Sequence, residues 1–505
     1  MKKIGIIELN STNIKLVAVD VLDNQSFVVT DRHEDKTQIA SDLNQDELIK
    51  TQSIMAITNI LKTYKALLNA YEINEVYSFA SSEYLNAKNQ RSFFDELYSS
   101  TGFRFKILSE EEEANNLYIS FINSLDCPKG LILNINGTNA QILAYNRRNC
   151  INQFNVSLGS VSLAEKYVGN EFNVEKAMLE IGKEFSKLIS KIDWFDDLDD
   201  ETQIVGTGEA FISIAKLSQK LKHYPYQKEH AYQFSKEDLD KVYDFVKTLD
   251  IDKTKKLKGI STQRADILAS GLAIVKAFAE KCGINKLVVS TNGVAEGYLF
   301  SRVNAGTQEK PTSDVLGSSL ETIYSYYNNS NLKNIQNVYE LSLILFKQLK
   351  VLHKLPRNFV KVLRIASYMF DSGKRISPTN FEKKGFNVVL DSDIYGVAHH
   401  EQVLAGFVVA CQKLENFSMT DWVKYNSILS DTDLEGVRKL AIIVKLATLL
   451  DMFGSGKVKD ISCDILGDSV IMKTIVESPA DMEIMEGIKV SADFAKAFKK
   501  HLEIL

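Results

Sequence analysis

The chain has 505 residues and a formal net charge of -5, with 45% hydrophobic and 25% charged residues. This length is too great for one hydrophobic core and predicts about two to four domains. The composition is that of a globular protein, and the charge excludes a chain that binds nucleic acid through an overall positive charge. A polyanionic ligand would therefore need a local binding site.

Cysteine spacing and hydropathy both predict a cytoplasmic protein. The five cysteines are far apart and form no CxxC pair, which is typical of reduced cysteines in the cytoplasm. The first residues lead directly into a strand-like segment, without the apolar run of a signal peptide. No segment approaches the ~18 uninterrupted apolar residues of a membrane span, so we expect no membrane association.

The first 126 residues alternate between strand and helix patterns. Residues 4–9, 14–21 and 26–30 are strand-like. Asn44 and Glu47 predict a capping box before a helix whose apolar residues recur at helical spacing from Ile54 to Tyr71. Further strand-like residues follow from 75, and a strand, a turn and a helix follow from 106. We expect these residues to form an α/β lobe.

The next segment repeats the strand–turn–strand pattern of the first residues. Residues 130–145 contain a strand, a Gly/Asn turn and a second strand, as residues 4–20 do. Two hairpins with polar turns, one in each successive lobe, are the phosphate-binding arrangement of actin-like folds, although single hairpins are common. Residues 204–217 and 286–300 each run strand, glycine turn, helix. Such a turn either leaves N–H groups for an oxyanion or simply connects the two elements.

Beyond a linker rich in Gly, Thr, Pro and Ser at 304–313, the chain is mostly helical. Amphipathic spacing predicts helices at 338–355, 360–369, 401–414 and 434–450. A strand pair at 460–466 and 469–476 precedes a final α/β stretch. The expected domains are lobe I at 1–126, lobe II at 127–305, a helical domain at 306–455 and a small α/β segment at 456–505.

Four of these segments resemble signatures of the exopolyphosphatase/guanosine-pentaphosphate phosphohydrolase (Ppx/GppA) family. ELNSTN at 8–13 is similar to D-x-G-S-N-S, SEEEEA at 109–114 to S-G-x-E-E-A, NINGTNAQ at 134–141 to D-I-G-G-G-S-T-E, and NVSLGSV at 155–161 to S-L-x-L-G-S/A-V. The resemblance covers nearly the whole chain and depends on the order and spacing of many weak matches. It implies an α/β fold with two actin-like (ribonuclease H-like) lobes, followed by an all-α HD-like domain and a small α/β C-terminal piece.

The resemblance also implies a hydrolytic site between the lobes. It places the water-activating carboxylate at Glu113, with Glu112 beside it, whereas acidic residues in a first helical turn are also explained by the helix dipole. Phosphate is expected at small polar residues of the turns, and these residue types equally favour turns without a ligand. The candidates are Ser11, Thr12, Asn13, Lys15, Gly137, Thr138, Asn139, Gly206, Thr207 and Gly208.

Several charged residues of the family signatures are missing. Glu8 and Asn134 stand where the family has aspartates, and Gln141 replaces an acid. Leu85 and Ala295 stand at family arginines. Mg²⁺ prefers anionic oxygen ligands, so Glu8 is the metal-ligand candidate, and the lost charge at Asn134 argues against a Mg²⁺ cofactor.

The C-terminal half resembles the HD-phosphohydrolase-like domain of longer family members. Phe370, followed by Asp371, stands where that domain has a metal-binding histidine, so we expect a structural domain. In the absence of a His-Asp doublet, His399 and His400 are expected at the surface or at an interface. The long family members imply a homodimer through this domain.

Two functions follow from the resemblance. The first is an exopolyphosphatase-like hydrolase that releases terminal phosphate from polyphosphate or a guanosine polyphosphate by Glu-activated water attack. The second is a catalytically weak or inactive relative that binds polyphosphate or a nucleotide as a sensor or regulatory protein. An actin-like ATPase or sugar kinase is disfavoured, because the first turn has no D-x-G-x-T sequence. Phe370 argues against a metal-dependent HD hydrolase.

Overall fold

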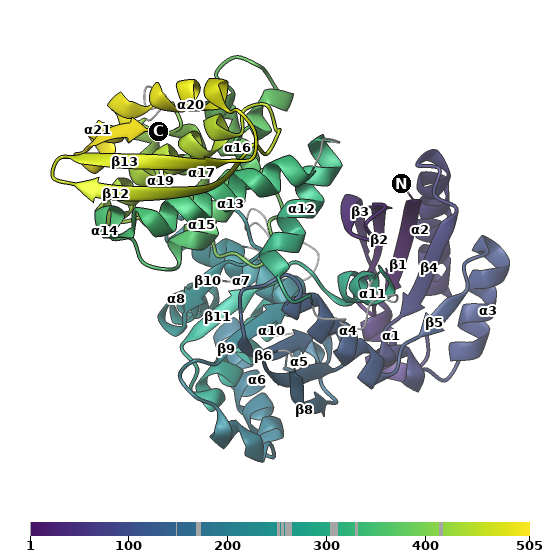
Figure 1. Ribbon diagram of the computed structural model, residues 1–505. Coiled ribbons are helices and arrows are strands. Elements are labelled where there is room, and N and C mark those ends of the chain that lie inside the picture. The colour runs from purple at the N-terminus through teal and green to yellow at the C-terminus, as the bar shows by residue number, and fades with distance from the viewer. Residues whose placement is uncertain are drawn as a thin grey trace. The chain divides into compact units, whose positions relative to one another are not determined.

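Two units make up the chain in the computed structural model, Met1–Val315 and Leu316–Leu505 (Figure 1). The structure describes residues 2–147, 149–167, 173–249, 265–303, 312–328, 332–413 and 418–505, together with residues 253 and 257. Most of the expected linker at 304–313 lies outside the described residues. Among the helices described, none combines the length and the apolar character that crossing a membrane requires.

The first lobe contains a five-stranded sheet of order β3-β2-β1-β4-β5, in which β1, β2 and β3 are antiparallel and β4 and β5 are parallel to β1. Alternation along the central strand β1 sends Ile4 and Ile6 into one core and Ile7 and Leu9 into another. The bounds are β1 (Lys2–Leu9), β2 (Asn13–Val21), β3 (Phe27–Lys36), β4 (Glu75–Ala80), β5 (Phe105–Ile107), α1 (Ile39–Asp46), α2 (Thr51–Ala70), η1 (Ser82–Asn86), α3 (Gln90–Thr101) and α4 (Glu110–Ile122).

The predicted capping box at Asn44 and Glu47 is wrong. Residues Ile39–Asp46 form a separate short helix, α1, and Glu47 ends it in a left-handed conformation with φ of 54°. Helix α2 begins only at Thr51, after Lys50, which makes no side-chain cap. The side chain of Asn44 instead donates to Glu165 in the second lobe.

The second lobe repeats the antiparallel three-strand arrangement of the first. Its six-stranded sheet has the order β10-β11-β9-β6-β7-β8, with an antiparallel run β6, β7, β8 and with β9 and β11 parallel to β6. The bounds are β6 (Lys129–Ile135), β7 (Ala140–Asn146), β8 (Asn149–Val156), β9 (Gln203–Thr207), β10 (Gln233–Ser235), β11 (Lys286–Val289), α5 (Ser160–Tyr167), α6 (Val174–Ile189), η2 (Asp193–Asp197), α7 (Gly208–Leu221), α8 (Lys236–Lys247), α10 (Ala265–Cys282) and α11 (Val294–Val303). Both predicted hairpins are therefore present, each at the centre of its own sheet.

Helices α4 and α11 pack against each other between the two sheets (Figure 1). One hydrophobic core contains Ile4 of β1, Ile132 of β6 and residues of both helices. The helices cross closely, since a Cβ on Gly297 of α11 would lie 1.8 Å from the carbonyl oxygen of Asn116 in α4. The two lobes are thus joined by a shared core as well as by the chain.

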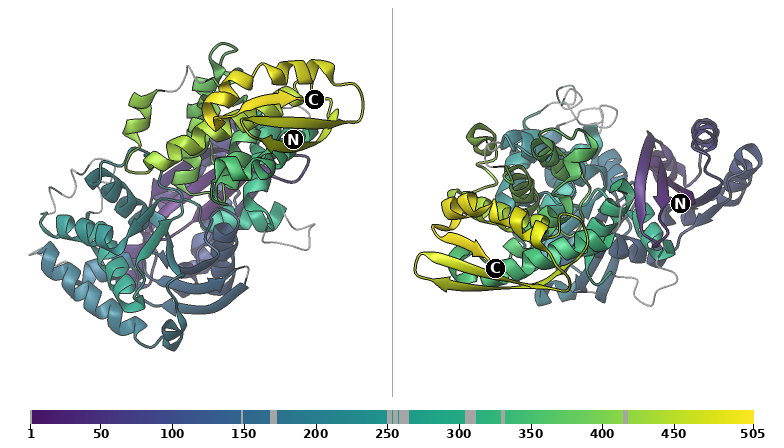
Figure 2. Two further views of the ribbon diagram at one scale, coloured as in Figure 1. Left: turned by 60° about the vertical axis from the view of Figure 1, so that its left-hand side comes forward. Right: turned by 45° about the horizontal axis from the view of Figure 1, so that its top comes forward.

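The second unit is mainly helical and ends in a small sheet of order β12-β13-β14 (Figure 2). Helices α17 and α19 form its centre, with nearly every residue of α17 buried. The bounds are α12 (Val315–Asn328), α13 (Leu332–Gln348), α14 (Lys350–His353), α15 (Phe359–Met369), η4 (Ser372–Arg375), α16 (Phe381–Asp391), α17 (His399–Ala410), α18 (Met419–Lys424), α19 (Asp431–Leu450), β12 (Val458–Leu466), β13 (Ser469–Val476), α20 (Asp481–Ile488), α21 (Ser491–Phe498) and β14 (His501–Ile504).

The two adjacent histidines of α17 lie in different environments. His399 is buried, so the expectation of a surface position is wrong for this residue. His400 is partly exposed, and its Nε2 lies 3.1 Å from Oδ2 of Asp433 at the start of α19. Asp371, which follows Phe370, is partly buried, and this burial raises the pKa of its carboxyl.

Candidate functional site

The turns that follow β1 and β6 meet between the two lobes. Ser11 is fully buried, and its Oγ lies 2.6 Å from the position that a Cβ on Gly137 would occupy. The same Cβ would also approach side-chain atoms of Ala40 and Thr12 to within 3 Å, at 2.5 and 2.9 Å. Only glycine allows the turns to approach this closely. The expected contact between the two hairpin turns is therefore present.

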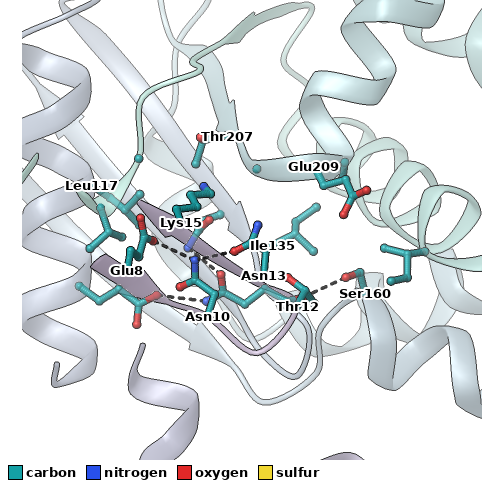
Figure 3. A pocket seen from close by; sticks show the side chains of 18 residues that line it. Glu8, Asn10, Thr12, Asn13, Lys15, Leu117, Ile135, Ser160, Thr207 and Glu209 are labelled. Atoms are coloured by element: carbon teal, nitrogen blue, oxygen red, sulfur yellow. Dashed lines mark hydrogen bonds between the residues drawn. The ribbon is translucent and has the colours of Figure 1, made fainter. Parts of the chain in front are cut away.

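A cavity of about 60 Å³ lies beside these turns and receives residues from both lobes (Figure 3). A single water needs on the order of 10–15 Å³ of such space, so the cavity can hold several waters or a small oxyanion. The first lobe contributes β1, β2 and α4, and the second contributes the ends of β6 and β9 and the starts of α5, α7, α10 and α11. The lining residues are Glu8, Asn10, Thr12, Asn13, Lys15, Glu113, Leu117, Asn134, Ile135, Asn136, Ser160, Thr207, Gly208, Glu209, Ala210, Ile267, Gly293 and Val294.

Glu113 faces this cavity from the first turn of α4 and is 1% exposed. Its Oε2 accepts hydrogen bonds from N and Oγ of Ser82 at 3.0 and 2.7 Å, and its Oε1 accepts one from Nδ2 of Asn136 at 3.2 Å. Burial raises the pKa of the Glu113 carboxyl to about 7, against the opposing effect of these hydrogen bonds. A carboxylate that titrates near neutral pH is suited to accept a proton from a water.

Glu112 does not line the cavity. Its carboxylate closes the capping box of α4 by accepting from the backbone N–H of Ser109, and it pairs with Lys106. The hydrogen bond from Lys106 lowers the pKa of the Glu112 carboxyl. Successive helical residues point about 100° apart, so only one of the two glutamates can face the cavity. The structure therefore places Glu112 at the helix terminus and not at the expected catalytic position.

Lys15 brings a positive charge to the cavity. It lies directly opposite Glu8 across β1 and β2 and opposite Glu34 across β2 and β3. Figure 3 shows its side chain extending toward Thr207, with Glu8 beside it. Burial lowers the pKa of Lys15, but the negative charges of Glu8, Glu34 and Glu296 outweigh it and hold this pKa above its usual value. Lys15 is therefore an ammonium ion at neutral pH.

The two glycines at the junction of β9 and α7 have different positions. Thr207 and Gly208 line the cavity at the start of α7, where Gly208 has φ of +84°. Gly206 does not, because its Cα faces the ring of Phe211. Ser160, which was not predicted, reaches the cavity from the start of α5. The expected N–H groups at a helix start are thus present at Gly208 but not at Gly206.

Thr138 and Asn139 lie in the turn after β6 but do not line the cavity. Thr138 donates from N and from Oγ1 to Oε1 of Glu83, both at 2.7 Å. Asn139 accepts from Nδ2 of Asn136. Glu83 also accepts from N of Ser11 at 3.4 Å. A carboxylate of η1 therefore connects the two turns.

Sequence reasoning missed Ser82, Glu83, Asn136 and Ser160. Ser82 and Glu83 belong to the segment 81–89, which we compared with a family signature only for its missing arginine. Glu83 is an acidic residue inside this segment, and that was the signal that could have identified it. Asn136 and Ser160 stand inside the signatures at 134–141 and 155–161, and their small polar side chains are the same signal that identified their neighbours.

The residues at the expected metal position do not suit Mg²⁺. Asn134 and Gln141 offer amides, with Nδ2 of Asn134 donating to Asn136 and Nε2 of Gln141 donating to the carbonyl of Glu110. Glu8 keeps one carboxylate oxygen without a hydrogen-bond partner among the described residues, but it lies opposite the ammonium of Lys15. No three acidic, histidine or cysteine side chains gather as a metal site in the described part of the chain. Mg²⁺ requires a more anionic set of oxygens.

Comparison with known proteins gives a consistent family match. The model of the Ppx/GppA phosphatase family matches residues 18–305. A bifunctional 3-dehydroquinate synthase/phosphatase of Fusobacterium nucleatum is 22% identical over 275 residues, which are 53% of this chain and 41% of that protein. A guanosine-5'-triphosphate,3'-diphosphate pyrophosphatase of Pseudoalteromonas atlantica is 22% identical over 353 residues, 68% of this chain and 66% of that protein. The chain thus spans less than two thirds of the length of either relative.

Solved structures share the fold of about 60% of this chain. An exopolyphosphatase from Cytophaga hutchinsonii superposes with a TM-score of 0.56 at 14% identity, covering 60% of this chain and 98% of its own. A Ppx/GppA family member from Aquifex aeolicus gives a TM-score of 0.52 at 18% identity, covering 61% of this chain and 99% of its own. These likenesses establish the α/β fold with two actin-like lobes.

Proposed function

Because this chain belongs to the Ppx/GppA phosphatase family, we propose that it hydrolyses the terminal phosphoanhydride bond of polyphosphate or of a guanosine polyphosphate. The substrate class follows from two similar proteins, an exopolyphosphatase and a guanosine-5'-triphosphate,3'-diphosphate pyrophosphatase. The reaction takes place in the cavity between the lobes.

The position of Glu113 is the observation that carries the proposal. This carboxylate lines the cavity, titrates at about pH 7 and shares the space with the ammonium of Lys15. Glu113 accepts a proton from a water as the water oxygen bonds to the terminal phosphorus and the anhydride P–O bond breaks. Lys15 and the backbone N–H at Gly208 stabilise the negative charge on the phosphate oxygens.

The donor set argues against the Mg²⁺ cofactor that the family resemblance implies. Asn134 and Gln141 lack the charge that would hold the ion, and Lys15 supplies a fixed positive charge close to Glu8. We therefore assign no step to a metal. Chelation of divalent cations is expected to leave the reaction of this chain largely unchanged.

The test is phosphate release from long-chain polyphosphate and from guanosine pentaphosphate by the full chain. We expect Glu113→Gln to lower the rate by roughly 100-fold or more, because the general base is lost. Glu112→Gln is the matched control, since it removes the same charge one residue away and still permits the capping box. Equal rates for the natural protein and Glu113→Gln would contradict the proposal.

A second function, binding of a phosphate polymer without turnover, is favoured by one observation. Asn134 and Gln141 carry amides where the family signatures have acids. The donors of the two turns are also already bonded to Glu83. Salt-sensitive binding of polyphosphate with no phosphate release would identify the chain as such a sensor or regulatory protein.

We also propose that the protein is a homodimer formed through the helical unit. Helix α20 exposes Met482, Met485 and Ile488 at intervals of three residues, with 56, 61 and 47% of each residue accessible. Residues three apart share one face of a helix. Apolar side chains on one face of an exterior helix are suited to a protein interface.

A further inference from the structure

Glu83 occupies the space between the two turns as an unusual buried carboxylate. It is 4% exposed, and its hydrogen bonds come from neutral hydroxyl and backbone groups. Its segment is fixed to the first lobe, because N of Ser81 donates to the carbonyl of Leu9 and the hydroxyl of Tyr84 donates to the carbonyl of Asn10. These bonds fix the residues on either side of Glu83 and thereby place its side chain between the two turns.

The donors around Glu83 come from both lobes. Thr138 of the second lobe gives its backbone N–H and its hydroxyl to Oε1, both at 2.7 Å. Ser11 of the first lobe gives its backbone N–H to Oε2 at 3.4 Å. Backbone N–H groups that converge from neighbouring turns bind anions in proteins, phosphates as well as carboxylates. The same groups would serve a phosphate oxygen equally well.

A second observation points to a ligand at this place. The hydroxyl of Ser11 is fully buried and has no hydrogen-bond partner among the described residues. It lies in the narrow contact with Gly137. Buried hydroxyls normally have a partner, and an unsatisfied one costs free energy. The residue whose N–H bonds to Glu83 therefore also carries a buried hydroxyl that no described residue satisfies.

We propose that Glu83 is an internal competitor of the substrate: in the ligand-free protein its carboxylate occupies the donors of Ser11 and Thr138, which the family resemblance assigns to phosphate. A terminal phosphate group of the substrate binds there only by displacing Glu83, because two buried anions cannot share the same donors. The inference rests on the proposed function and deepens it, since it identifies a residue of this chain that opposes the binding of a phosphate group at the two turns beside the cavity.

The experiment uses inorganic phosphate as the probe and measures its affinity for the full chain by isothermal titration calorimetry at constant ionic strength. Glu83→Ala removes the competing carboxylate and is expected to tighten phosphate binding by on the order of tenfold or more. Glu111→Ala is the control, because Glu111 is an exposed acid of the first turn of α4 that does not line the cavity. Its affinity should equal that of the natural protein.

A second variant tests whether the tighter phosphate binding arises at Thr138. Thr138→Val in the Glu83→Ala background removes one of the donors and is expected to reverse part of the increase. An equal affinity of Glu83→Ala and the natural protein, or an increase that Thr138→Val leaves unchanged, would overturn the inference. If Glu83→Ala fails to fold, Glu83→Ser removes the same carboxylate and keeps a small polar side chain, and an absence of tighter phosphate binding in that variant overturns the inference as well.

This result is separable from the proposed hydrolysis. The proposed hydrolysis is contradicted if the natural protein releases no phosphate or if Glu113→Gln releases it equally fast. The inference about Glu83 fails on phosphate affinity alone, whatever the rate of release.

Discussion

Glu113 combines full burial with hydrogen bonds from two segments that are distant in sequence. The burial raises the pKa of its carboxyl from 4.5 to about 7, so in the folded protein it keeps a proton that it loses in the unfolded chain. A difference of about 2.5 in pKa corresponds to about 3 kcal/mol. The pH dependence of stability therefore reports directly on this residue.

We expect the free energy of unfolding of the natural protein to fall, relative to that of Glu113→Gln, by about 3 kcal/mol between pH 4.5 and 7. The sign follows because the folded state binds more protons than the unfolded state in this range, and its stability is lost as pH rises through the folded pKa. Urea unfolding across this range measures the effect. Of the two tryptophans, Trp194 belongs to the first unit, so a Trp422→Phe background isolates its fluorescence.

Parallel pH profiles for the natural protein and Glu113→Gln would contradict this prediction. Glu112→Gln is again the control, because Lys106 lowers the pKa of Glu112 and the opposite sign applies there. That carboxylate adds stability above its unfolded pKa, and the stability is lost as pH falls through the lower folded value.

At the scale of elements, the crossing of α4 and α11 fixes how the lobes pack. Gly297 lies where a Cβ would overlap the backbone of Asn116, and backbone atoms cannot move aside as a flexible side chain can. The crossing sits in the core shared by the two sheets. A larger residue must therefore separate the helices and loosen that core.

We expect Gly297→Ala to destabilise the first unit by about 1–3 kcal/mol, as overpacked cores do. Gly182→Ala in α6 is the matched control, since its added Cβ would have no neighbour nearer than 3.8 Å. Alanine forms helices better than glycine, so that variant should be more stable by about 0.5–1 kcal/mol. Thermal unfolding followed by Trp194 fluorescence distinguishes the two, and equal midpoints would show that the crossing tolerates a side chain.

The sequence predicted the elements that have strong local patterns. Both hairpins, the strand pair in the second unit and the helix that ends at Leu450 lie where periodicity placed them. The contact between Ser11 and Gly137 was also predicted, because both stand in turns of repeated hairpins. The hairpins and the helix depend on residues close together in the chain, which a single sequence displays, whereas the contact between the two turns was implied by the family resemblance.

The features that were missed depend on contacts between distant segments. Glu83 lies between residues 11 and 138 only after the lobes have folded, and the local sequence shows it only as an acidic residue within a degenerate signature. Asn44 satisfies a local capping rule, but its side chain bonds to Glu165 across the lobes. Glu112 and Glu113 are alike in sequence, and contacts in the folded protein separate their environments, because Lys106 pairs with Glu112 whereas Ser82 and Asn136 bond to Glu113.

At the scale of the whole molecule, the chain divides into two units with a buried core in each. The candidate site lies entirely within Met1–Val315, whereas the exposed apolar face of α20 lies in Leu316–Leu505. Changes in one unit should therefore leave the chemistry of the other intact. This separation allows the proposed dimer to be tested without altering the candidate site.

We expect light scattering of the full chain to give twice the mass of one chain, and Met485→Glu to give the mass of one. A charge in the middle of the apolar face would be buried without a partner in the dimer. Met55→Glu is the matched control, because Met55 of α2 is equally exposed, at 61%, but lies in the first unit. A monomeric natural protein, or a dimeric Met485→Glu variant, would contradict the proposed interface.

The hydrogen bonds of Glu113 have one further consequence. Its carboxylate is held by Ser82 in the first lobe and Asn136 in the second, so rotation of one lobe against the other must break one set of these bonds and admit solvent. Hydration returns the carboxyl toward its ordinary acidity, and the proton held in the closed form is then released. Proton release and lobe opening are thus thermodynamically linked, and alkalinisation from about pH 4.5 to about 7 favours the open state.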